Sequence, residues 1–184
     1  LGGNSIHMEF ATFFLGFGGQ WVDSDFKPIM NQKNGVEALT YFCDLLNVHK
    51  VVPPDAQAVG YLEKNQYYQA GKVGMMLQWA AAYTEILDPS LSPKVYDVTG
   101  VALIPGRLID GEIRRGAQAS CQAWVVPKTA PNKKSAMDFI TWIASFDGSK
   151  EWVLRGGSPG NLSVYSDPEV RSYREDAALH AQTM

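Results

Sequence analysis

The chain has 184 residues, which is enough for one ordinary domain with its own hydrophobic core. Apolar residues make up 46% and charged residues 19%, as is typical of a soluble globular protein. The formal net charge of -3 is too small to indicate a nucleic-acid-binding or anionic-membrane surface, and no apolar run approaches the roughly 18 residues needed to cross a bilayer.

Apolar residues that recur at helical spacing predict a series of amphipathic helices. In the second of these helices, Asn34 is the expected N-cap and Glu37 follows three residues later, the pattern of a capping box. Asn132 is expected to cap a later helix, and Ser166 to begin the last one. The predicted helices cover residues 5–17, 35–47, 61–70, 79–87, 132–145 and 149–154, with a last one from residue 166.

Three continuous apolar runs predict buried strands, while the polar stretch 107–118 is predicted to be an exposed loop. Because strands alternate with helices, the predicted fold class is α/β. Three strands are few for this length, so we expect a sheet that lacks some of its neighbours. The predicted strands are residues 73–77, 98–104 and 122–126.

The N-terminus and the cysteines leave the cellular compartment open. Leu1 is followed by two glycines, without an initiator Met or signal-peptide features, so the start is interpreted as a cut within a longer chain. Cys43 and Cys121 stand alone in the sequence and are predicted to be unpaired, buried small residues, although the sequence does not decide whether they pair.

No catalytic or cofactor template fits the sequence. The three histidines stand alone, so no metal site is predicted, and Lys72 lacks the upstream glycine of a phosphate-binding loop. Two acidic pairs, Asp23 with Asp25 and Asp110 with Glu112, keep glycoside hydrolysis open, since that reaction uses two facing carboxyl groups. Both pairs lie in polar stretches, where solvated acids are the ordinary expectation. We therefore predict a protein that is not an enzyme and needs no cofactor.

Trp79 is the most informative aromatic residue, because it closely follows the predicted strand at 73–77. In open α/β sheets, ligands bind beyond the carboxyl ends of the strands. A sugar has an apolar C–H face and a polar rim, so a flat indole beside an amide such as Gln78 suits it. The alternative is that Trp79 is a core residue. For Trp21, which follows two glycines at a helix end, the alternative is packing within the fold.

Eight short stretches occur along the chain in a fixed order: GGQWVD at 18–23, GVEALTYFCDL at 35–45, VPP at 52–54, AGKVGMMLQW at 70–79, VALIPG at 101–106, AWVVPK at 123–128, NKKSAMDFITW at 132–142 and SDPEV at 166–170. This ordered set resembles family 1 extracellular solute-binding proteins, the group that includes maltose-, glycerol-phosphate- and trehalose-binding proteins. Each stretch is loose alone, but the series covers nearly all of the chain.

The resemblance implies a periplasmic-binding-protein-like (type II) α/β fold, in which two lobes close over a ligand. The chain is then expected to be a helix-rich, incomplete part of such a two-lobed protein. Residues 1–97 would form a segment of the C-terminal lobe, residues 98–131 the strands and loop that cross to the N-terminal lobe, and residues 132–184 the helices that return.

The resemblance also implies a set of ligand-binding residues at loops and element ends. Trp79 takes the place of the aromatic that stacks on the sugar. Ser120 and Cys121 stand where many relatives have two glycines, and Asn161 stands where an arginine is common, so the local contacts differ from the family pattern. The full implied set is Gly19, Trp21, Gln78, Trp79, Ser120, Cys121, Gln122, Ser158 and Asn161.

The implied function is that of the solute-binding component of an ABC importer, located in the periplasm or outside the cell, with a lipid anchor left open. Hinge closure would capture a sugar or polyol and deliver it to the membrane permease. A chain with one lobe would bind much more weakly than a two-lobed protein. The alternatives are a carbohydrate-active enzyme, a carbohydrate-binding module and a protein-interaction module. The sequence does not identify the solute.

Overall fold

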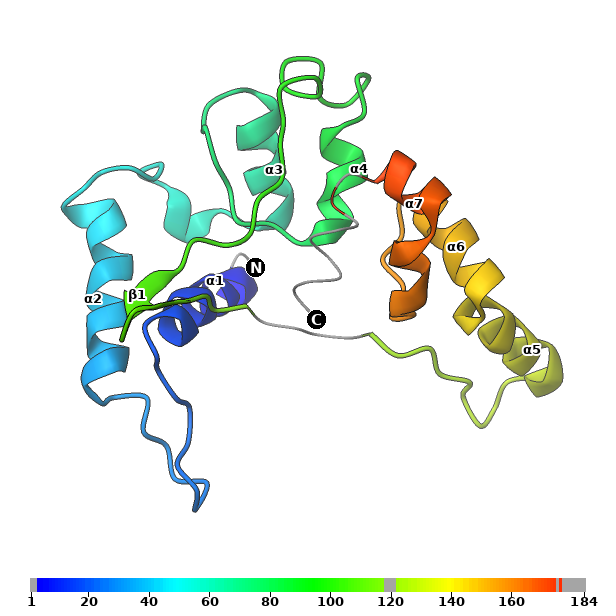
Figure 1. Cartoon of the computed structure of the whole chain (residues 1–184), viewed down its shortest axis with the longest axis horizontal. Helices are drawn as coiled ribbons and strands as arrows, with labels where there is room; N and C mark the ends of the chain where they lie inside the picture. Colours follow the sequence, from blue (N-terminus) through cyan, green and yellow to red (C-terminus); the bar gives the residue numbers. More distant parts are fainter. Residues whose placement is uncertain (1–2, 118–121, 175, 177–184) are drawn as a thin grey trace. The chain divides into compact units, whose positions relative to one another are not determined.

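The computed structural model describes residues 3–117, 122–174 and 176, and within these ranges it is rich in helix (Figure 1). Seven α-helices, three short 3-10 helices and one two-stranded sheet are found there. In chain order they are α1 (Gly3–Gly16), α2 (Lys33–Asn47), η1 (Ala56–Ala58), α3 (Tyr61–Gln69), η2 (Ala80–Ala82), α4 (Tyr83–Ile86), β1 (Arg107–Ile109), β2 (Glu112–Arg114), α5 (Lys133–Ala144), α6 (Phe146–Leu154), η3 (Leu162–Ser166) and α7 (Pro168–Tyr173).

The predicted helices are confirmed, with bounds that differ by a few residues, except that the stretch 79–87 is divided into the 3-10 helix η2 and the short α4. Two of the three predicted starts are wrong. Asn132 accepts a hydrogen bond from the Ser135 N–H at 3.1 Å, as expected of an N-cap. Asn34 instead lies inside the first turn of α2, where its amide donates to the Gly18 carbonyl at 3.1 Å. At the last helix, Asp167 rather than Ser166 is the cap.

The strand predictions are wrong in their positions. None of the three apolar runs has strand hydrogen bonding among the described residues, and the stretch predicted to be a loop contains the antiparallel hairpin β1–β2. Asp110 and Gly111, with φ angles of +52° and +83°, form the tight turn that favours a hairpin. Because a strand needs a hydrogen-bonded neighbour, the local turn produces a ladder whereas the apolar runs remain unpaired.

The chain forms two compact units, here called unit 1 (within residues 1–78, 86–99 and 103–118) and unit 2 (within residues 79–85, 100–102 and 119–184). In unit 1, α1 packs against α2 around Phe14, which is fully buried. The Phe14 ring lies 4.2 Å from that of Trp21 and 5.7 Å from that of Phe10, measured between centroids. This aromatic centre fixes the loop that follows α1.

Two ion pairs link further elements to the helices of unit 1. Arg107 of β1 donates to the Glu37 carboxylate at 2.8 Å, and its guanidinium lies 4.5 Å from the centroid of the Phe17 ring. This hydrogen bond lowers the pKa of Glu37. Lys64 of α3 pairs with Glu9 of α1. The hairpin and α3 are therefore both held against the first helical pair.

Unit 2 has a separate small core. It contains Val153 of α6, Val164 and Tyr165 of η3, and Val170 of α7, all of them buried. Because α6, η3 and α7 share this core, the loop that joins α6 to η3 is anchored at both of its ends.

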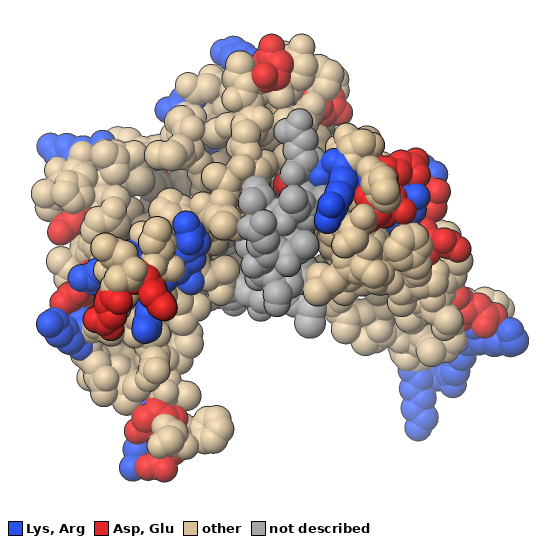
Figure 2. Space-filling view, viewed as in Figure 1, with Lys and Arg blue, Asp and Glu red and all other residues tan. Residues whose placement is uncertain are grey.

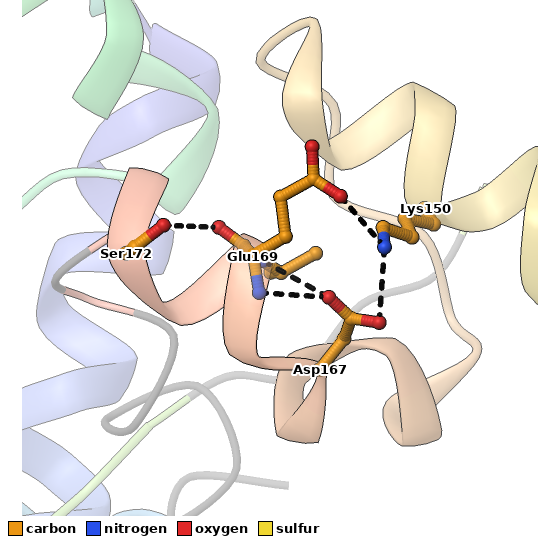
Figure 3. A network of polar contacts seen from close by, with 5 residues as sticks. Lys150, Asp167, Glu169 and Ser172 are labelled. Carbon is orange, nitrogen blue, oxygen red and sulfur yellow. Dashed lines mark hydrogen bonds and ion pairs between the residues drawn. The ribbon is translucent and has the colours of Figure 1, made fainter.

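A polar network on the edge of that core fixes the start of α7 (Figure 3). Lys150 lies between the carboxylates of Asp167, at 3.1 Å, and Glu169, at 2.8 Å. The Asp167 carboxylate also accepts the N–H groups of Glu169 and Val170, so it caps α7 while it pairs with the lysine. The hydrogen bond from Lys150 lowers the pKa of Asp167.

Candidate ligand-binding site

Trp79 lies at the N-cap position of η2 and exposes 55% of its surface. Its carbonyl accepts the Ala82 N–H at 3.0 Å, so the backbone is fixed while much of the indole faces solvent. The alternative that Trp79 is simply a core residue does not agree with this exposure. The segment before it is irregular, however, so its expected place at the mouth of a sheet is not found among the described residues.

The backbone beside Trp79 is tied to a buried arginine at the end of α7. Arg174 is 1% exposed, and its Nη2 lies 3.5 Å from the Ala80 carbonyl oxygen. The guanidinium also lies 4.9 Å from the centroid of the Tyr83 ring, a cation–π contact. The same side chain reaches the loop after α6, since Nη1 lies 3.5 Å from the Gly157 carbonyl oxygen.

The charge of this arginine is matched by one carboxylate. Arg174 Nε donates to Asp176 Oδ1 at 2.7 Å and Nη2 donates to Oδ2 at 2.6 Å, a bidentate pair that is almost completely buried. Burial alone would lower the pKa of Arg174, but the hydrogen bonds and charge of Asp176 outweigh burial and raise it. The guanidinium of Arg174 therefore stays protonated at neutral pH.

Ser158 and Asn161 are predicted ligand-binding residues, and their loop lies in unit 2, as does Trp79. The Ser158 hydroxyl oxygen is shielded from solvent. The Asn161 carboxamide oxygen accepts from the Ser163 hydroxyl at 2.6 Å and from its N–H at 3.3 Å, and its amide donates to the Ala144 carbonyl at 3.4 Å. Asn161 thus has a structural role as the cap of η3, and its ligand contact stays a prediction.

The predicted residues Gly19, Trp21 and Gln78 belong to unit 1. A Cβ at Gly19 would lie 2.6 Å from the Phe14 ring, so only glycine fits there. Trp21 is 38% exposed and packs on Phe14, in agreement with the packing alternative for that residue. The Gln78 amide donates to Asn65 at 2.5 Å, which ties Gln78 to α3.

A polar hollow of about 290 Å³ lies between the loop that contains Gly18 and Gly19 and the start of α2. Its lining includes Gly19, which the sequence singled out, and Gln32 and Lys33, which it did not. Asn34 and Gly35, in the first turn of α2, also line this hollow. Trp21 is not part of the lining, so the hollow is distinct from the aromatic contact with Phe14.

The remaining predicted residues are less informative. Gln122 is exposed, whereas Ser120 and Cys121 lie outside the described residues. Cys43 is exposed, so the expectation that it is buried is wrong. It points outward because Ala38 and Gly35, rather than the face that contains Cys43, are the buried residues of α2.

The acidic pairs that kept hydrolysis open have evident roles in turns. Asp23 accepts the N–H groups of Asp25 and Lys27, both at 2.9 Å, and Asp110 forms the turn of the hairpin. Within the described ranges, no three His, Cys, Asp or Glu side chains are grouped as a metal site would require. The described helices include none with the length and apolar character of a membrane span. On the face shown in Figure 2, acidic and basic residues are interspersed.

Known proteins resemble this chain over most of its length. One curated relative is a probable amino-acid ABC transporter periplasmic-binding protein, y4oP, of Sinorhizobium fredii, which is 26% identical over 157 residues. Those residues are 85% of this chain and 34% of the relative. The chain thus spans about a third of that protein's length.

Two solved structures share the fold. Maltose-bound MalE3 of T. maritima matches 96% of this chain with a TM-score of 0.80 at 24% identity. An ABC transporter solute-binding protein of Agrobacterium radiobacter, in complex with ribitol, matches 98% of it with a TM-score of 0.74 at 23% identity. The chain covers 45% of each of these structures. These matches confirm the predicted α/β fold of the periplasmic-binding-protein type.

The family follows from a match that extends along almost the whole sequence. The model of the bacterial extracellular solute-binding proteins matches residues 3–180. This range includes all of the elements described above and most of each compact unit. The chain belongs to the bacterial extracellular solute-binding protein family.

Proposed function

We propose that this chain takes part in solute capture for an ABC importer, in the periplasm or outside the cell, and that its ligand is a sugar or polyol. Family membership supports a binding role rather than an enzymatic one. The observation that carries the ligand class is Trp79, a large aromatic that is 55% exposed on a fixed backbone. Such a ring can stack on the C–H face of a carbohydrate.

The solved relatives support this ligand class, because one contains maltose and the other ribitol. The curated relative is described as a probable amino-acid transporter protein, which makes an amino acid the second candidate. Trp79 favours the first candidate, since an amino acid requires charged partners for its ammonium and carboxylate groups. Trp79 supplies no such charge.

The mechanism we propose is closure of a two-lobed protein around the ligand, followed by docking on the membrane permease. The chain spans 45% of each solved relative, so a protein of their length has room for the second lobe. The proposed division places residues 1–97 and 132–184 in one lobe and residues 98–131 in the crossing to the other. Ligand contacts on both lobes would stabilise the closed form by the difference in affinity between the two forms.

Isothermal titration against maltose, ribitol and a mixture of amino acids tests the ligand class. Binding of maltose or ribitol, with no heat from the amino acids, is the expected result. In a two-lobed protein that contains this chain, Trp79→Ala should weaken the Kd about 5- to 150-fold, equivalent to about 1–3 kcal/mol of lost stacking and burial.

Trp142→Ala is the matched control, because Trp142 is 48% exposed and lies on α5. It should leave the Kd unchanged. Binding of amino acids alone would contradict the proposed ligand class, and equal affinity of the wild type and Trp79→Ala would contradict the role of the indole.

A further inference from the structure

Arg174, the buried arginine at the end of α7, makes contacts beyond its ion pair with Asp176. Its guanidinium touches three separate segments of unit 2: Asp176 after α7, the Gly157 carbonyl after α6 and the Ala80 carbonyl beside Trp79. Ala80 is also the first residue of η2, and Trp79 is its N-cap. A single guanidinium therefore contacts the backbone next to the exposed indole of Trp79 as well as two other segments of the unit.

Stability alone does not explain such a pair. A buried ion pair pays a large desolvation penalty, and well-packed apolar residues of similar volume often stabilise a fold as well or better. What apolar side chains lack is the directed set of N–H donors that a planar guanidinium presents. Those donors meet two backbone carbonyls at defined positions, at Ala80 and Gly157.

A second contact supports coupling between the same two segments. Gly156, in the left-handed region with φ of +92°, lies against Thr84 so closely that a Cβ would be 2.8 Å from the threonine hydroxyl. The turn after α6 and the segment 79–85 thus meet at two places, through Arg174 and through this close approach.

We propose that Arg174, held by Asp176, is a positioning residue for the Trp79 platform. It fixes the carbonyl of Ala80 and, through Gly157, the adjacent loop that contains Ser158. Arg174 does not itself touch the ligand in this proposal. Its effect on affinity rests on the proposed function of Trp79, whereas its effect on the conformation of Trp79 does not.

The test combines ¹⁹F NMR with calorimetry on protein labelled with 5-fluorotryptophan. The chain has five tryptophans, and each resonance is assigned by a single Trp→Phe substitution. The variant Arg174→Met/Asp176→Leu replaces the ion pair by apolar side chains of similar size. We expect it to unfold at the wild-type urea midpoint or above. The resonance of Trp79 should shift and broaden in the absence of ligand, while that of Trp142 stays unchanged.

Arg174→Lys is the second variant, because it keeps a cation for Asp176 but not the fork that reaches both carbonyls. It should remain folded if the double variant does not, with a Trp79 resonance that again differs from the wild type. With maltose or ribitol, whichever binds the wild type, the Kd should weaken about 5-fold or more in each folded variant.

Two failures can be told apart. A Trp79 resonance that is unchanged in every folded variant would overturn the positioning role of Arg174. If that resonance changes as expected but the affinity does not, the positioning role stands and the proposed function of Trp79 fails. A general loss of structure would also move the Trp142 resonance, and that result in Arg174→Lys would contradict the specific role.

Discussion

The replacement of Phe14 by alanine provides the sharpest test of how unit 1 is held together. The ring is fully buried, and it contacts Trp21 at 4.2 Å and Phe10 at 5.7 Å between centroids. It also fills the space beside Gly19, where a Cβ would lie 2.6 Å from it. Because the ring is fully buried, its truncation leaves a cavity.

The expected cost follows from area and from ring contacts. Phe→Ala removes roughly 130 Å² of buried apolar surface, which is worth about 3 kcal/mol at ~25 cal/mol per Å². The lost aromatic pairs add about 1 kcal/mol, and the sum of about 4 kcal/mol lies within the usual range for such truncations. For an m-value of about 2 kcal/mol/M, the urea midpoint should fall by about 2 M.

Urea unfolding followed by circular dichroism measures this loss, with Phe26→Ala as the control. Phe26 has the same side chain but is 84% exposed, so its truncation should change the free energy of unfolding by less than about 0.5 kcal/mol. A loss below about 1 kcal/mol for Phe14→Ala, or equal losses for both variants, would refute the reasoning that Phe14 is the centre of the unit.

Two further predictions concern a close approach and a titration. Gly35→Ala would place a Cβ 1.9 Å from the Met30 carbonyl oxygen, so the thermal midpoint should fall clearly, whereas Gly74→Ala, with nothing within 4 Å, should leave it nearly unchanged. Similar midpoints would contradict the packing at α2. The lowered pKa of Asp167 means that its pair with Lys150 stabilises the fold above the unfolded pKa of about 3.9 and is lost as pH falls through the folded value. The stability difference between wild type and Asp167→Asn, measured by urea unfolding from pH 6 to 2, should therefore shrink at low pH, and a constant difference would contradict the charge pairing.

The helices could be predicted from the sequence because their signal is local. Apolar spacing and the Asn132 cap need no information from distant residues, and both are confirmed. The Asn34 cap failed because a tertiary contact with the Gly18 carbonyl engages its amide. The strands failed because pairing depends on a neighbour that a single segment does not reveal, although the Asp110-Gly111 turn was a usable signal for the hairpin.

The candidate site was predicted in part. The exposure of Trp79 agrees with the prediction, but the strand end at which the sequence placed it is not found among the described residues, and Trp79 instead precedes η2. Arg174 and Asp176 were missed because charged residues in a polar stretch near a chain end are ordinarily solvated, and only the tertiary fold buries them. The cap formed by Asn161 was also missed, although its bond with Ser163 is local and only the bond from its amide to the Ala144 carbonyl depends on the tertiary fold.

The chain's alternation between its two compact units limits how it can be dissected genetically. Residues 79–85 and 100–102 belong to unit 2, while the intervening stretch 86–99 belongs to unit 1. Any truncation that keeps one contiguous stretch therefore removes part of one unit or retains part of the other. Deletions from either end would therefore yield few stable products, and isolating either unit would require excision of two internal stretches with rejoining of the flanking ends.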